Sequence, residues 1–148
     1  MVIEIIKIEK KGFMIVCYKM VYRGELKTGE IFDLDDRFVE NSAVIKGMME
    51  VCKVEDTIPL MYDGLNLDLL NKIVKILRFC LGDIDRVVKK FMGEYMVNEN
   101  IEEIGQILNV VHFYDIGLVE DYLVEYFAER IKLCKDEREL EGLFGKVE

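Results

Sequence analysis

The first part of the chain alternates short runs of β-branched and aromatic residues with turns that contain glycine. Residues 2–9 and 13–22 are joined by a short turn that ends at Gly12, which predicts a β-hairpin. A third short strand is predicted over 30–34, after the glycine-bracketed segment 24–29. We therefore expect the chain to begin with a β-meander.

The spacing of apolar residues becomes helical after Asp35. Ser42 is expected to cap a helix over 43–52, because its hydroxyl oxygen can accept a hydrogen bond from the first turn. Pro59 makes 57–60 an extended segment, since proline disfavours helical angles in the residue before it and cannot donate to a sheet. We interpret this segment as an edge strand.

The rest of the chain is predicted to be helical. Asp83 and Asp115 are expected to open two of the helices, and glycine at position 82 to end an earlier one. The expected helices span 66–82, 83–96, a stretch from Asn98 or Asn100 through Val111, 115–134, and a last short segment over 139–144.

The helix from Gly117 to Cys134 has an unusually wide apolar surface. At 100° per residue its apolar side chains cover roughly 240° of the circumference, whereas a surface helix needs about 100°. Either the helix is sandwiched inside the domain, or one of its faces binds another chain. Leu140 and Phe144 follow it with little sequence left to cover them, which favours a partner-binding surface.

Composition limits the classes of function. A chain of 148 residues, 51% apolar and 33% charged, is typical of one globular domain. The net charge of −9, with no concentrated Lys and Arg, makes a nucleic-acid partner unexpected. No signal peptide and no apolar span of membrane length is recognisable, so we expect no membrane partner and a cytoplasmic or nuclear location, or both.

Motifs for catalysis or metal binding are not apparent. The only histidine, His112, lies between apolar neighbours without a nucleophile motif, and we interpret it as a helix-surface residue. An enzyme that uses Cys80 or Cys134 is disfavoured, because neither has a basic neighbourhood that would lower its pKa. The adjacent carboxylates Glu102 and Glu103 are expected to be solvated. We predict a protein that is not an enzyme and has no cofactor, no metal and free thiols.

The order of these parts resembles the BTB/POZ fold, and three stretches resemble the Skp family, the S-phase kinase-associated adaptor subunits of SCF ubiquitin ligases. The three stretches are GEIFDLD (29–35) with NSAVIKGMME (41–50), IPL (58–60) before LLNKIVKIL (69–77), and VVHFYDIGLVEDYLVEYFAERIK (110–132) leading into DERELEGLF (136–144). Together they cover about residues 22–146.

The resemblance implies an α+β fold in which a small β-sheet is packed with helices, followed by a carboxy-terminal helical extension. It divides the chain into an amino-terminal hairpin extension (1–21), a BTB/POZ domain (22–114) and a carboxy-terminal helical region that binds F-box proteins (115–148). The implied function is that of a non-catalytic adaptor that bridges an F-box protein to a cullin.

The resemblance also assigns contact residues to each partner. The positions that match F-box contacts are Ile104, Leu108, Val124, Phe127, Ile131, Leu140 and Phe144. The cullin contacts are matched by His112, Phe113, Met48 and Met49. Two alternatives remain within the fold: a subunit similar to elongin C, and a self-associating scaffold. In the second case the apolar hairpin would support a homodimer of the unpartnered chain.

Overall fold

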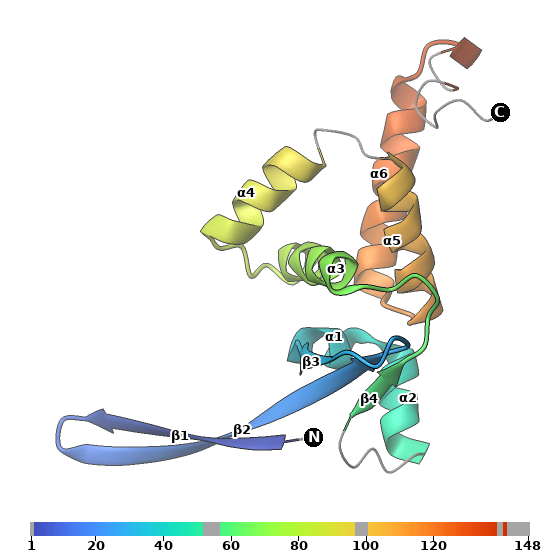
Figure 1. Cartoon of the computed structure of the whole chain (residues 1–148). Coiled ribbons are helices and arrows are strands. Elements are labelled where there is room, and N and C mark those ends of the chain that lie inside the picture. Colours follow the sequence, from blue (N-terminus) through green and yellow to red (C-terminus); the bar gives the residue numbers. More distant parts are fainter. Residues whose placement is uncertain (1, 52–56, 97–100, 139–140, 142–148) are drawn as a thin grey trace.

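The computed structural model describes residues 2–51, 57–96, 101–138 and 141, with the side chains of 2–6, 15 and 17–20 left aside. Helices combine with a small sheet, so the protein is α+β, as the sequence predicts. The later helices lie together on one side of the sheet, and the hairpin at the start of the chain extends away from the body (Figure 1).

The predicted hairpin is confirmed. Strand β1 (Val2–Lys10) pairs antiparallel with the first part of β2 (Phe13–Leu26). Lys11 and Gly12 join them with φ angles of 53° and 76°. Two consecutive positive φ angles are typical of the type I′ turn, whose twist matches that of the strands on either side.

The second part of β2 is the central strand of a small sheet. It pairs antiparallel with β3 (Ile31–Leu34) and parallel with β4 (Ile58–Leu60), which confirms the predicted third strand and the predicted extended segment. Gly24 is needed here, because a Cβ at this position would lie 2.7 Å from the Phe32 ring. The domain boundary predicted after residue 21 falls inside β2, so hairpin and sheet share one continuous strand.

Two short helices follow the meander, and the second is the one predicted after Ser42. Helix α1 (Asp36–Asn41) is capped by the side chain of Asp35, and α2 (Ala43–Val51) begins directly after Ser42. The Oγ atom of Ser42 accepts a hydrogen bond from the backbone N–H of Ile45 at 3.2 Å. This is the capping contact that the sequence predicts for Ser42.

Helices α3 (Leu67–Cys80) and α4 (Arg86–Tyr95) pack against each other. The side chain of Asn66 caps α3 by accepting a hydrogen bond from its first turn. The expectation that Asp83 opens α4 is wrong: Asp85 is the capping residue. The carboxylate of Asp83 forms ion pairs with Arg37 and Arg78, whereas Oδ1 of Asp85 accepts a hydrogen bond from the N–H of Val88 and so caps the helix.

The last two helices, α5 (Ile101–Phe113) and α6 (Gly117–Leu133), are joined by a tight corner. The sequence predicts that Asp115 opens α6, but α6 begins two residues later and Asp115 has a φ angle of 52°. The N–H groups of Asp115 and Ile116 bond to carbonyls of the last turn of α5. Asp115 therefore terminates α5 in a Schellman-type corner instead of starting α6.

One core connects all of these helices with the sheet. Helix α3 packs against α1, α4, α5 and α6. Val119 and Leu123 of α6 are buried in the same core, so the predicted carboxy-terminal region packs onto the rest of the chain. The largest fully buried side chains are Tyr114, Phe38, Ile45, Ile58, Leu60, Ile73, Ile76, Leu77, Ile104, Ile107, Ile116 and Leu123.

Candidate partner-binding surfaces

Helix α6 buries one row of side chains and leaves an apolar row beside it open. Val119 and Leu123 are fully buried. On the neighbouring flank Val124 is 52% exposed, Ile131 is 43% exposed, and Phe127 is half-buried between them. The spacing of these three residues, i, i+3 and i+7, places them on one helix face.

Helix α5 borders the same flank of α6. His112 of α5 contacts Glu120 of α6 through Nδ1 and Oε1 at 2.7 Å. Because the two helices are antiparallel, the residues four positions before His112 and four after Glu120 are Leu108 and Val124, one turn farther on the same side. We call the surface formed by Leu108, Val124, Phe127 and Ile131 the α5–α6 face.

The floor of the α5–α6 face is made of small residues. Gly105 lies on α5 next to Leu108, and Ala128 lies on α6 between Phe127 and Ile131. A Cβ added to Gly105 would meet nothing within 4 Å. The backbone of α5 at Gly105 is therefore open to the approach of another chain.

Four of the residues expected to contact an F-box protein lie together on the α5–α6 face. Ile104 does not: its side chain is 0% exposed and packs in the core, so it has no surface for a partner to contact. The resemblance predicted Ile104 as a contact residue, whereas its position on α5 turns its side chain into the core. Leu140 and Phe144 lie outside the described residues.

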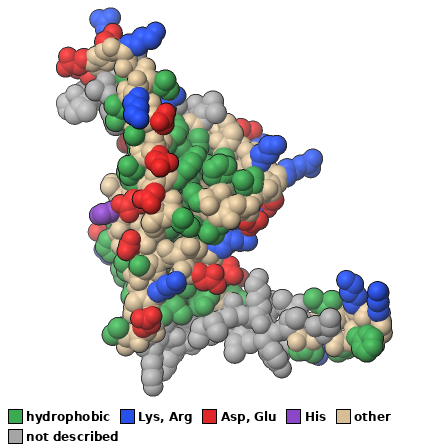
Figure 2. Space-filling model, turned by 180° about the vertical axis from the view of Figure 1, so that it is seen from behind, with side chains coloured by type: hydrophobic (Ala, Val, Ile, Leu, Met, Phe, Trp, Pro, Cys, Tyr) green, Lys and Arg blue, Asp and Glu red, His purple; other side chains and the backbone are tan. Residues whose placement is uncertain are grey.

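The opposite flank of α6 is also apolar. Leu118 is 46% and Leu133 is 67% exposed, and between them the ring of Tyr122 lies 5.5 Å from that of Phe79. Figure 2 shows hydrophobic side chains gathered between α6 and α4 on this side of the body. The alternative in which α6 is sandwiched inside the domain is therefore wrong, because both flanks of its buried row remain exposed.

The four residues expected to contact a cullin do not all lie on one surface. His112 faces α6, with its side chain 77% exposed. Phe113 is 51% exposed and lies on the other side of α5, with its ring 5.1 Å from that of Tyr62. Met49 packs against the core, whereas Met48 is half-buried on the outer side of α2. Of the four, Phe113 lies beside Tyr62, the residue that follows Met61.

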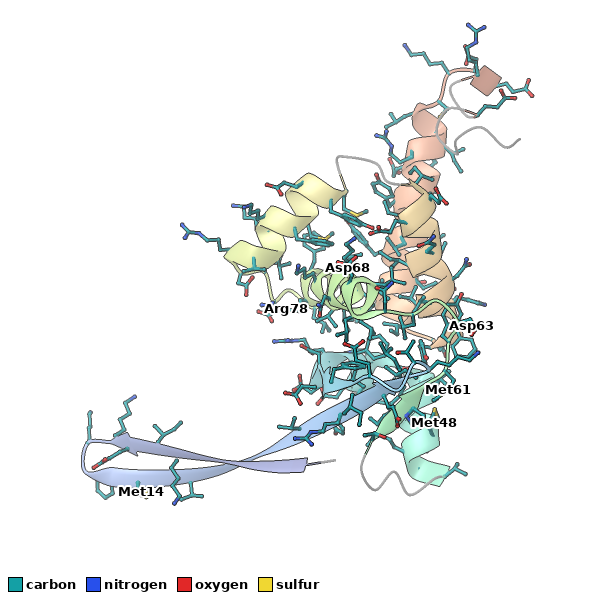
Figure 3. All side chains as sticks on the ribbon, viewed as in Figure 1. Met14, Met48, Met61, Asp63, Asp68 and Arg78 are labelled. Carbon is teal, nitrogen blue, oxygen red and sulfur yellow. The ribbon has the colours of Figure 1, made fainter. Side chains whose placement is uncertain are left out.

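A second apolar surface follows from α2. Val44, Met48 and Val51 repeat at i, i+4 and i+7, and Val51 is 87% exposed. Met61, which follows β4, is 52% exposed and lies at the same end of the body as Met48 (Figure 3). We call Val44, Met48, Val51, Met61 and Phe113 the α2 face.

Sequence reasoning missed Val44, Val51 and Met61. The periodic spacing along α2 was a signal for the first two. Met61 follows a three-residue strand, so its exposure depends on tertiary packing.

Ser42 holds the α2 face against the α5–α6 corner. Its side chain is fully buried, and its hydroxyl donates a hydrogen bond to the carbonyl oxygen of Tyr114 at 2.5 Å. The backbone N–H of Val44 bonds to the same carbonyl at 3.4 Å, and that of Ala43 bonds to the carbonyl of Asp115 at 3.2 Å. The start of α2 is therefore fixed to the end of α5.

One polar cluster joins α3, α4 and α5. Lys72 donates to Oε1 of Glu103 at 2.5 Å, and the hydroxyl of Tyr95 donates to the same oxygen. The hydrogen bond from Lys72 is the largest influence that lowers the pKa of Glu103, and burial raises the pKa of Tyr95. Glu103 was expected to be solvated, but its half-buried side chain takes part in packing three helices together.

Burial raises the pKa of the Cys80 thiol, which is the opposite of what a nucleophile needs. No group of three metal-ligating side chains occurs in the part of the chain that the structure describes. None of the helices in this part is long and apolar enough to cross a membrane.

Comparison of the sequence with known protein families and with curated proteins finds no match. A functional assignment for this chain therefore depends on its exposed surfaces and on the residues that carry the family resemblance.

Proposed function

We propose that the chain is a non-catalytic adaptor of an SCF-type ubiquitin ligase, which binds the helical F-box segment of one partner and a cullin. The observation that carries the proposal is the α5–α6 face. Its four residues are ones that the sequence resemblance predicts to contact an F-box protein. Two of them, Val124 and Ile131, expose about half of their side chains. Exposed apolar groups of this kind mark interaction sites.

The shape of the α5–α6 face suits a helix. Gly105 leaves open space beside α5, and the apolar side chains of Val124, Phe127 and Ile131 repeat at helical spacing along α6. An amphipathic helix binds such a surface by laying its own apolar stripe along it. An F-box segment is a partner of this type.

The α2 face supports the second half of the proposal. It lies at the corner where α5 turns into α6, while Ile131 is about 20 Å away along α6. Two surfaces this far apart allow two partners to bind at once, which is the property that an adaptor needs. The cullin is proposed for the α2 face because Met48 and Phe113 were both matched to cullin contacts.

Binding measurements with one purified F-box segment and one cullin amino-terminal domain from the same cell test the proposal. Val124→Asp is expected to raise the Kd for the F-box segment by about 30-fold, corresponding to about 2 kcal/mol, and to leave cullin binding unchanged. Val51→Asp is expected to weaken cullin binding only. Because both side chains are largely exposed, neither change should unfold the chain.

Leu118→Asp is the matched control, since Leu118 is 46% exposed on the opposite flank of α6. It should leave the affinity for the F-box segment unchanged. If Val124→Asp binds as tightly as the unmodified chain, or if Leu118→Asp weakens binding to the same extent, the placement of the F-box site is wrong. If neither purified partner binds the unmodified chain, the adaptor function is wrong.

A further inference from the structure

The hairpin of β1 and β2 forms an arm that the body does not cover. Val2–Lys10 spans about 30 Å at strand spacing. At its free end Phe13 is 74% exposed and Met14 is 65% exposed. Figure 2 shows hydrophobic and basic side chains together at the end of the arm. A two-stranded hairpin with exposed apolar residues is marginal in water, so the arm needs something to pack against.

The two faces of the arm differ in chemistry. Residues opposite each other in an antiparallel pair share a face, so the register places Phe13 with Lys10, and Met14 with Glu9. One face therefore presents an aromatic ring beside a cation, and Lys11 lies in the adjoining turn. The other face presents a thioether beside a carboxylate.

A groove of about 340 Å³ lies where the arm joins the body. It is formed between β2, β3 and α3 and has both apolar and acidic walls. The apolar wall includes Val21, Phe32, Leu67 and Val74, and the acidic side consists of Asp33, Asp35 and Asp36. Its volume is at the lower end of the range for pockets that hold small ligands.

We propose that two copies of the chain exchange arms, so that the tip of each arm occupies the groove at the base of the other. Two equal arms placed side by side in antiparallel directions bring each tip to the other's base, because Val21 both ends the hairpin pairing and lines the groove. Phe13 then packs against the apolar wall, and Lys10 reaches the carboxylates. The contact is the same in both directions, as a two-fold symmetric dimer requires.

The opposite net charges of the arm and the body favour the tip of a second copy's arm as the group that occupies the groove. Residues 1–22 carry four lysines and two glutamates, a net charge of +2, whereas 23–148 carry 16 basic and 27 acidic residues, a net charge of −11. Of the groove's three aspartates, Asp33 and Asp35 already pair with Arg23 and Arg37 of the same chain. Asp36, which is exposed at the start of α1, is the carboxylate best placed to receive Lys10.

Light scattering of the purified full chain measures the exchange. At about 100 µM protein the unmodified chain is expected to be a dimer, and Phe13→Asp a monomer. Met14→Asp is the matched control: it adds the same charge at the neighbouring exposed position, but on the opposite face, and should remain dimeric. Asn71→Arg, an exposed substitution that lines the groove, should also give a monomer.

Mixing the two monomeric variants separates arm exchange from other contacts. A heterodimer of Phe13→Asp with Asn71→Arg contains one unmodified arm tip facing one unmodified groove, so an equimolar mixture should regain dimer mass. Four results would overturn the proposal: a monomeric unmodified chain, a dimeric Phe13→Asp, a monomeric Met14→Asp, or a mixture without dimers. The assay contains no F-box protein or cullin, so its failure leaves the adaptor proposal untouched.

Discussion

Replacing Ser42 by alanine tests how the α2 face is held in place. The change removes two hydrogen bonds of a fully buried hydroxyl, one donated to the Tyr114 carbonyl and one accepted from the Ile45 N–H. Loss of a helix cap costs about 1 kcal/mol, and loss of a buried hydrogen bond costs about 1 kcal/mol more. The carbonyl keeps the N–H of Val44 as a partner, which limits the second cost.

We therefore expect Ser42→Ala to lower the free energy of unfolding by about 2 kcal/mol. For a chain of this length the corresponding fall in Tm is about 4–8 °C. Urea denaturation followed by circular dichroism measures the first quantity, and a thermal scan measures the second. Amide hydrogen exchange adds a local measurement, because the Ile45 N–H loses its acceptor and should exchange faster.

Thr28→Ala is the control for Ser42→Ala, since Thr28 lies exposed in the turn between β2 and β3. It removes the same hydroxyl group from a solvated position and should change stability by less than about 0.5 kcal/mol. If Ser42→Ala is as harmless as Thr28→Ala, the buried contacts of Ser42 do not hold α2 to the α5–α6 corner.

Two further predictions concern α5. Ile104→Ala is expected to lower the free energy of unfolding by about 2–5 kcal/mol, because the side chain of Ile104 is fully buried. Urea denaturation measures this free energy. A value within about 1 kcal/mol of the unmodified chain would contradict the place of Ile104 in the core. Glu103→Gln is expected to cost about 1 kcal/mol at neutral pH, because the bond from Lys72 holds the pKa of Glu103 below its ordinary 4.5. That stabilisation is complete above pH 4.5 and is lost as pH falls through the lowered pKa, so urea titrations should show the difference shrinking in acid. A difference that does not vary with pH would contradict the ion pair.

Local sequence signals predicted most of the secondary structure. The hairpin turn at Lys11 and Gly12 and the cap at Ser42 depend on residues close together in the chain, so the sequence is sufficient to find them. The errors at Asp83 and Asp115 have a common cause. Each aspartate was a suitable helix cap by its local pattern. In the structure the carboxylate of Asp83 forms ion pairs with arginines, and the backbone of Asp115 forms the corner between α5 and α6.

The sequence by itself determined that α6 has more apolar surface than one core can cover, because helical periodicity is a local property. It could not determine which part of that surface stays exposed. The antiparallel packing of α5 on α6 turned Ile104 inward and left Val124 and Ile131 outside, although all three were matched to the same contact. Only the tertiary structure brings the groove to the base of the arm, since residues 21 of β2 and 74 of α3 are far apart in the chain but line the same groove.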